Sequence, residues 1–327
     1  MPSSVYDRYR ISWANLPTPP TPSSHSNEME LYCAKLSHAV YSLEQNARHD
    51  PAKDFVPSRT HREPDASTRD FYFWIDGADI PSSPQYESPE GIIPIIGDRA
   101  SAVLVWRHNH LAIAFRGSSS WQDWIHNFNA KRVPPPTTFR QYDCQLHKGF
   151  YGLANNLFPS INEHIWRFVE ARPTSRGRSG RQRNQDINIT LCGHSLGGAL
   201  AQLFSVCRNE HHYGSSLIRA TYTFGAPRIG KGEAFRLITR PHYRLIVRGD
   251  PVPQTPPLFT DDFEASFLDR QGRYSEPGNT FGQIGKAVKT MLMKNSLDFG
   301  SHDIEEYIHS IEDKIQAAQA KSTPRGP

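Results

Sequence analysis

The stretch INITLCGHSLGGALAQL, residues 187–203, decides the fold of this chain. From Ile187 to Cys192 apolar residues alternate with others, which predicts a short buried strand. A tight turn with the sequence GHSLG follows at residues 193–197, and the small residues after it are typical of a helix packed closely on a sheet. This strand, turn and helix form the context of the G-x-S-x-G nucleophile elbow.

Ser195 is the candidate nucleophile at the centre of this turn. A serine on so sharp a turn lies in strained backbone, so the positions two before and two after it, Gly193 and Gly197, must lack colliding side chains. The amino end of the following helix directs free N–H groups and a positive dipole toward an anion forming beside Ser195. We therefore favour a catalytic serine over an idle serine in a glycine-rich turn.

Composition limits the class of protein. The chain has 327 residues, of which 37% are hydrophobic, which fits one large α/β domain. A formal net charge of +4 is too near balance to indicate a nucleic-acid partner. The sequence has no apolar run long enough to span a membrane and begins without the apolar segment of a secretory signal. Four cysteines without C-x-x-C spacing predict free buried thiols, a reducing compartment and no metal site.

We predict one α/β domain over residues 29–316, between a Pro/Ser-rich leader at 1–28 and a flexible tail at 317–327. Strands alternate with helices around the elbow, which indicates a mostly parallel sheet covered by helices on both faces. Residues 79–97, with four prolines, and residues 254–280 are expected to be irregular. The expected strands are 102–106, 111–115, 187–192, 220–224 and 243–247, and the expected helices include 29–43, 151–169 and 301–316.

An arginine-rich segment at residues 171–186 cannot form a core. It is either a solvated loop or a contact for anionic lipid headgroups, since each cation near such a surface contributes about 1 kcal/mol. Its five arginines are Arg172, Arg176, Arg178, Arg181 and Arg183.

A second candidate region follows the strand that ends near Phe115. The sequence Arg-Gly-Ser-Ser-Ser at 116–120 places N–H groups and hydroxyls at a sheet edge, as an oxyanion hole requires. The next residues carry four large apolar side chains at helical spacing, which indicate either an ordinary packed helix or a hinged lid that opens onto lipid. These side chains are Trp121, Trp124, Ile125 and Phe128.

A serine nucleophile needs a base, and in this architecture the expected order is Ser, then Asp or Glu, then His. His302 follows an irregular stretch and can reach back to Ser195, whereas the other downstream histidines lie at less suitable places (His211, His212, His242 and His309). Asp250 follows the carboxyl end of a strand, where α/β sheets keep their active residues. Asp261, Asp262 and Asp303 are weaker candidates.

Together these residues resemble the class 3 lipase family of fungal-lipase-like α/β-hydrolases. The matching stretches run in the family's order between about residues 102 and 307. They are FRGSSSWQDWIHNF, HKGF, ITLCGHSLGGALA, YTFGAPRIG, RGDPVPQTPP and SHDIEEY.

The resemblance implies specific roles. Ser195 is the nucleophile, Asp250 orients the base and His302 is the base. Ser118 and the backbone N–H of Leu196 form the oxyanion hole, and the helix around 121–128 is the lid. No metal and no cofactor is expected.

We therefore predict a serine hydrolase that cleaves carboxylic esters of lipids, with acylglycerols as the expected substrates, at a membrane or droplet surface. The lack of a signal peptide and of disulfides distinguishes this chain from secreted members and favours a cytoplasmic location with peripheral binding to lipid. The alternatives are a phospholipase A1, an esterase for soluble esters, or a non-catalytic lipid-binding protein on the same scaffold. The oligomeric state cannot be predicted.

Overall fold

The fold was analysed in a computed structural model of the chain. The structure describes residues 11–12, 26–41, 75–76, 86–96, 100–117, 131–135, 142–172, 175–176, 182–183, 187–210, 217–238, 241–256, 259, 265–268, 274–275 and 300–322. None of the helices in these ranges combines the length and the apolar character needed to cross a membrane.

A central sheet organises the described residues, and its strands follow the order β15-β14-β13-β11-β10-β5-β4-β3. The neighbours from β5 to β14 run parallel, while β3, β4 and β15 are antiparallel at the two edges. The strands are β3 (Glu90–Ile96), β4 (Ser101–Arg107), β5 (His110–Phe115), β10 (Asn188–His194), β11 (Ile218–Phe224), β13 (His242–Val247), β14 (Ala265–Leu268) and β15 (Tyr274–Ser275).

The elbow strand β10 lies in the parallel centre of this sheet. It pairs with β5 on one side, where Leu191 is opposite Ile113, and with β11 on the other, where Leu191 is opposite Thr221. A strand buried on both faces needs apolar residues without strict alternation, and six of the seven residues of β10 are buried. The carboxyl end of β10 therefore lies between other parallel strands that end at the same edge.

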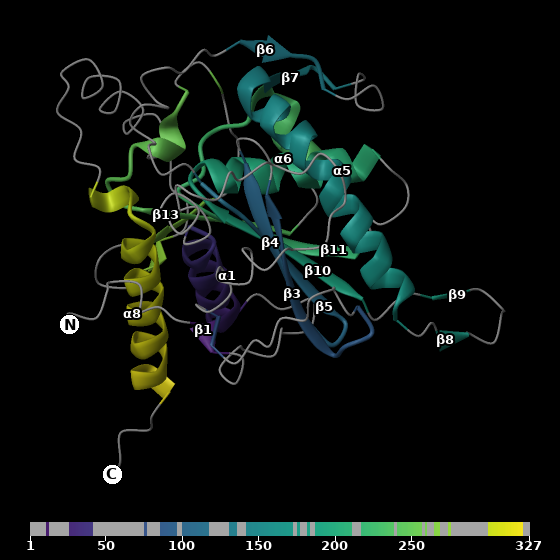
Figure 1. The fold of residues 1–327 in the computed structure, drawn as a ribbon. Helices are drawn as coiled ribbons and strands as arrows, with labels where there is room; N and C mark the ends of the chain where they lie inside the picture. The colour runs from purple at the N-terminus through teal and green to yellow at the C-terminus, as the bar shows by residue number, and fades with distance from the viewer. Residues whose placement is uncertain are drawn as a thin grey trace, which may run out of the picture.

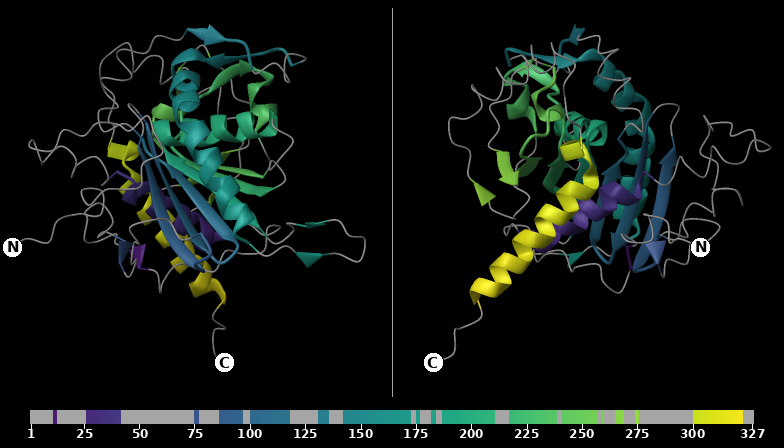
Figure 2. Two further views of the ribbon diagram at one scale, coloured as in Figure 1. Left: turned by 45° about the vertical axis from the view of Figure 1, so that its right-hand side comes forward. Right: turned by 90° about the vertical axis from the view of Figure 1, so that its left-hand side faces the viewer.

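Helices cover both faces of the sheet, as predicted (Figure 1). On one face, α5 (Lys148–Glu170) and α6 (Leu196–Glu210) enclose a cluster that includes Phe115, Phe150 and Phe204. On the other face, α1 (Asn27–Ala39) and α8 (Ile304–Ser322) pack over Cys192, Phe224 and Leu245. Figure 2 shows α1 and α8 crossing each other on that face, with the last part of α8 extending away from the sheet.

The periphery consists of short elements. A small sheet has the order β12-β7-β6, and two further pairs are β1 with β2 and β8 with β9. The strands are β1 (Ile11–Ser12), β2 (Ile75–Asp76), β6 (Arg132–Val133), β7 (Cys144–His147), β8 (Ser175–Arg176), β9 (Gln182–Arg183) and β12 (Gly230–Gly232). The 3-10 turns are η6 (Glu233–Leu237), η7 (Val252–Gln254) and η8 (Gly300–His302).

The structure corrects two sequence-based expectations about strands. Residues 90–96 were expected to be irregular but form β3, in which Pro94 pairs opposite Val103. Because β3 is an edge strand, a residue without an N–H is tolerated there. Within 254–280, also expected to be irregular, β14 and β15 extend the sheet beyond β13. These two strands are too short to show an apolar pattern in the sequence.

The first arginine of the arginine-rich segment also differs from expectation. Arg172 is buried, with 8% of its surface exposed, and its guanidinium lies over the Phe168 ring at 4.1 Å. It donates hydrogen bonds to the backbone carbonyls of His108 (2.9 Å), Ser88 (3.4 Å) and Tyr86. Arg172 therefore holds the end of α5 against the β3–β4 side of the sheet and is not available to lipid headgroups.

Candidate active site

Ser195 lies at the junction of β10 and α6 in the backbone conformation that the elbow requires. Its φ is 55°, in the left-handed region that is costly for a residue with a side chain. Its N–H donates to the Phe224 carbonyl at 2.9 Å, which ties the turn to β11. A Cβ at Gly193 would collide with the backbone of Gly197, and one at Gly197 with the backbone of Phe115. The two glycines thus permit the sharp turn.

A buried hydrogen-bonded chain joins the three side chains proposed for catalysis. Nε2 of His302 lies 2.9 Å from Ser195 Oγ, and Nδ1 of His302 lies 2.9 Å from Asp250 Oδ2. Their exposed fractions are 1% for Ser195, 5% for Asp250 and 2% for His302. A carboxylate only accepts hydrogen bonds, so Nδ1 carries the proton and Nε2 accepts from the serine hydroxyl. This arrangement can move a proton from Ser195 to His302.

Asp250 is held from two sides. It follows β13, and its Oδ1 accepts a hydrogen bond from the Val252 N–H at 2.9 Å. Its Oδ2 accepts a second one from the hydroxyl of Tyr307 on α8. Burial, together with the negative charge of Asp250, raises the pKa of Tyr307 well above its usual value, so this phenol stays a donor. These two hydrogen bonds therefore orient the carboxylate of Asp250 independently of its contact with His302.

Of the predicted oxyanion-hole and lid residues, the structure describes only Leu196. Leu196 is the first residue of α6 and is buried, and the N–H groups of a first helical turn have no partner within the helix. Ser118 lies outside the described residues, as do the four predicted lid side chains Trp121, Trp124, Ile125 and Phe128. The oxyanion hole and the lid therefore stay predictions.

The weaker sequence candidates are not at the triad where they are described. His242 lies at the start of β13, where its Nε2 is 3.0 Å from the Thr223 hydroxyl. His309 is exposed on α8, and Asp303 is exposed and accepts from the Glu305 N–H at 3.1 Å. The remaining candidates, His211, His212, Asp261 and Asp262, lie outside the described residues.

Sequence reasoning missed several residues that contact the triad. One is Gly225, whose φ is 58° and where a Cβ would lie 2.6 Å from Asp250 Oδ2 and 3.0 Å from His302 Cε1. Others are Tyr307, described above, and His194, whose Nε2 is 2.8 Å from the backbone oxygen of His302. His194 and Gly225 lay within the quoted motifs without a role assigned to them, and the signal for Tyr307 was its place shortly after His302.

In the part of the chain that the structure describes, no group of three or more His, Cys, Asp or Glu side chains is arranged to hold a metal ion. The chemistry available at the triad is nucleophilic attack by an activated serine, which needs no metal in principle. The expectation that no cofactor is required stays a prediction.

Comparison with known proteins gives consistent results. The model of the family "Lipase (class 3)" matches residues 112–260. Secreted mono- and diacylglycerol lipase 1 of Fusarium solani is 27% identical over 151 residues, which cover 45% of this chain and 40% of that protein. Phospholipase A1-IIgamma of Arabidopsis thaliana is 24% identical over 236 residues, covering 68% of this chain and 52% of that protein. The chain spans about half the length of the curated relatives it matches.

One solved structure supports the fold. A mutant form of MDLA of Penicillium cyclopium superposes with a TM-score of 0.50 at 16% identity, covering 79% of this chain and 83% of that one. At this identity the likeness concerns the fold alone. It agrees with a parallel-centred sheet between two helical layers.

Proposed function

We propose that this chain is a carboxylic ester hydrolase that acts on lipid esters, because the model of the class 3 lipase family matches residues 112–260 and a mono- and diacylglycerol lipase is among its relatives. The observation that carries the proposal is the buried chain from Ser195 through His302 to Asp250, with 2.9 Å at each step. This is the geometry that general-base activation of a serine needs.

The reaction proceeds in two halves. Ser195 Oγ attacks the acyl carbonyl carbon while its proton passes to Nε2 of His302, and Asp250 stabilises the imidazolium through Nδ1–H. The C–O bond to the alcohol breaks, and His302 returns the proton to that leaving oxygen. Water then repeats the sequence on the acyl-enzyme, which releases the carboxylic acid and restores the serine.

The negative charge on the carbonyl oxygen needs donors. We assign them to the N–H of Leu196, at the start of α6, and to Ser118. One such donor typically contributes about 3 kcal/mol to transition-state stabilisation. The positive end of the α6 dipole, which lies beside Ser195, supports the same position for the oxyanion.

Acylglycerols are the proposed substrate class. The relative from Fusarium solani is a mono- and diacylglycerol lipase by name, and the apolar stripe at 121–128 suits a lipid surface better than a soluble ester. A phospholipase A1 activity is the second candidate, because several plant relatives carry that name. The acyl-chain and headgroup preferences depend on the shape of the acyl pocket.

The test is substrate profiling of the purified chain, with Ser195→Ala as the control. We expect hydrolysis of emulsified diacylglycerol or triacylglycerol above that of phosphatidylcholine vesicles, and a rise in rate when a short-chain ester exceeds its solubility limit. Faster release of fatty acid from phosphatidylcholine would favour the phospholipase. A rate that does not rise at the interface would count against the lid, and a folded chain that turns over no ester would favour a non-catalytic lipid-binding protein.

We also propose that the chain works in a reducing compartment, on the surface of a membrane or lipid droplet. Cys33, Cys144 and Cys192 form no disulfide, and all three are buried. Such thiols are the expected state in a cytoplasmic protein. Fractionation of cells that express the full-length protein would test this location.

A further inference from the structure

We infer that His194 and Tyr41 are positioning residues for the catalytic base: a hydrogen-bonded chain from the Tyr41 hydroxyl through the His194 ring to the His302 backbone carbonyl fixes the imidazole in line with Ser195. The inference rests on the proposed hydrolase function. Neither residue has a role in the mechanism above, and Tyr41 lies outside the range matched by the family model.

The two hydrogen bonds from His194 are short; the one to His302 is buried, and the one to Tyr41 is partly buried. Nε2 of His194 lies 2.8 Å from the backbone oxygen of His302, and Nδ1 of His194 lies 2.9 Å from the hydroxyl of Tyr41. The rings of His194 and His302 are also in contact, with centroids 4.7 Å apart and planes 32° from parallel. His194 therefore supports the base both at its backbone and under its ring.

The partners determine the protonation of His194. A backbone carbonyl can only accept, so Nε2 of His194 carries the hydrogen, and in the neutral ring Nδ1 is then an acceptor for the Tyr41 hydroxyl. Burial, and next the neighbouring His302, lower the pKa of His194 well below its usual value, which favours this neutral form. Neutrality matters because a cation beside His302 would oppose the imidazolium formed during catalysis.

His302 needs such support because of its place in the fold. It ends η8, just before α8, so its carbonyl lies at the junction of two elements. The base must keep its Nε2 aligned with Ser195 Oγ, and an error of 1 Å in such geometry can cost about 100-fold in rate. A donor fixed to the elbow itself, one residue before the nucleophile, holds the two reacting groups in one frame.

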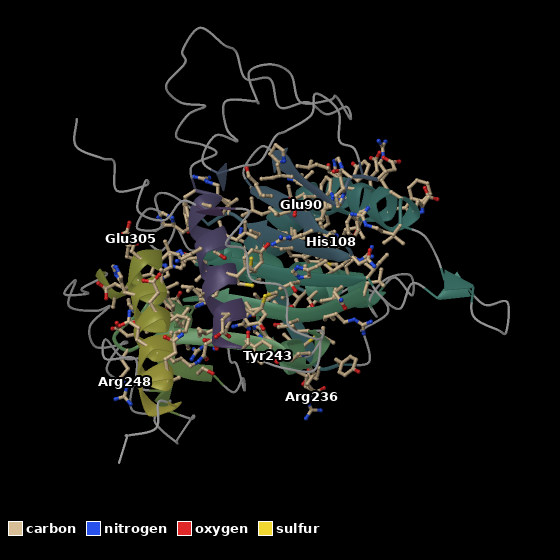
Figure 3. All side chains as sticks on the ribbon, turned by 90° about the horizontal axis from the view of Figure 1, so that it is seen from below. Glu90, His108, Arg236, Tyr243, Arg248 and Glu305 are labelled. Atoms are coloured by element: carbon tan, nitrogen blue, oxygen red, sulfur yellow. The ribbon has the colours of Figure 1, made fainter. Side chains whose placement is uncertain are left out.

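The helix α1 delivers Tyr41 to this point. Tyr41 follows the end of α1, and a Cβ at Gly117 would collide with its hydroxyl, so the phenol also packs against the strand-β5 side of the site. α1 lies beside α8 in the view of Figure 3, which labels Glu305 on α8. Nε2 of His38 on α1 lies 3.8 Å from that carboxylate. The helix that supplies Tyr41 thus packs on the helix that follows the base.

Three variants test the inference by steady-state hydrolysis of a soluble p-nitrophenyl ester. His194→Phe keeps an aromatic ring but loses both nitrogens, and we expect kcat to fall about 100-fold because the base is misaligned. KM should stay near that of the wild type, since His194 does not touch the substrate. His194→Gln can supply an amide N–H toward the carbonyl and should regain most of the lost kcat.

Tyr41→Phe is the mildest change, because it removes one oxygen and leaves the ring. We expect kcat to fall about fivefold, the worth of one net hydrogen bond, again with KM unchanged. Because this variant should fold as the wild type does, it carries the test if His194→Phe fails to fold. The inference would be overturned if Tyr41→Phe keeps the wild-type kcat and His194→Phe either keeps it too or fails to fold.

The controls separate this inference from the proposed function. If the wild type turns over the ester and Ser195→Ala does not, the hydrolase function stands, whatever the positioning variants do. Equal losses of kcat in His194→Phe and His194→Gln would also overturn the positioning role, because they would show that the donor is not what matters. If the wild type has no more turnover than Ser195→Ala, the proposed function fails and the inference fails with it.

Discussion

The elbow and the α1–α8 helix pair both position catalytic groups, but the chain encodes them in different ways. The elbow is local: one strand, one turn and one helix within residues 187–203 place Ser195 with the required φ of 55°. The helix pair joins residues from opposite ends of the chain, such as Glu30 and Lys314, whose charged groups are 2.9 Å apart. Local geometry can be read from sequence spacing, whereas the long-range contacts depend on the fold.

We expect the largest loss of activity from Gly225→Ala, which adds one methyl group at the point where the two regions meet. A Cβ there would lie 2.6 Å from Asp250 Oδ2 and 2.8 Å from the Tyr307 hydroxyl. Separating Asp250 from His302 should lower kcat by about 10⁴-fold, the loss typical of a triad with its orienting acid disabled. The measurement is ester turnover in variants shown to be folded by circular dichroism.

Gly249→Ala is the matched control for that variant. Gly249 also has a positive φ, of 96°, so alanine is strained there as well, but among the described residues its Cβ would meet only Ser301, at 3.5 Å from Oγ. We expect a comparable loss of stability and most of the activity retained. Equal losses of activity in the two variants would mean that backbone strain, rather than intrusion into the triad, explains the effect.

We expect the contribution of the α1–α8 helix pair to appear in the free energy of unfolding. Lys314→Met removes the ammonium 2.9 Å from the fully buried carboxylate of Glu30. Breaking a buried ion pair costs several kcal/mol, and because Lys314 is partly exposed we expect about 2 kcal/mol in the free energy of unfolding. Urea denaturation provides the measurement.

Lys35→Met is the control on the same two helices. The pair of Lys35 and Glu312 has the same 2.9 Å separation, but both side chains are about one-third exposed, so its loss should cost below about 1 kcal/mol. If the two variants lose the same free energy, burial is not what makes the Glu30 contact important to the α1–α8 pair.

The strand pair β5 and β10 should be distinguished by the response of its stability to acid. His110 on β5 is buried, its Nε2 lies 2.9 Å from the Thr190 hydroxyl on β10, and burial lowers its pKa to about 4. Between that value and the pKa of about 6.5 of an unfolded chain, the unfolded state binds more protons, so stability falls as the pH is lowered through this window.

The measurement is the free energy of unfolding against pH for the wild type and His110→Gln. One proton contributes a slope of about 1.4 kcal/mol per pH unit, and the variant should lose that contribution between about pH 4 and 6.5. An unchanged slope in the variant would show that His110 is not the group that titrates.

Much of the fold followed from the sequence. Apolar runs with turn signals predicted the β4–β5 hairpin, β10, β11 and β13, and the alternation with helices predicted both helical layers. The edge strand β3 escaped prediction because Pro94 and Gly91 are unusual in strands, and β14 escaped because it has only four residues. These edges owe their strand conformation to pairing with neighbours rather than to their own sequence.

The catalytic site likewise contains residues that the sequence predicted, while other contacts could not be predicted from it. Ser195, Asp250 and His302 could be proposed because their positions follow from the elbow, the end of β13 and the start of the last helix. Arg172 was grouped with solvated arginines because sequence alone does not show the three carbonyls that it meets. Tyr41 carried no signal, since its partner His194 is far from it in the sequence.

The most direct test of the account is covalent labelling with a fluorophosphonate, followed by peptide mapping. We predict one equivalent of label on Ser195 in the wild type, none in Ser195→Ala, and slow labelling in Asp250→Asn because the base is no longer oriented. A folded wild type that stays unlabelled, or a Ser195→Ala variant that keeps its ester turnover, would contradict the account.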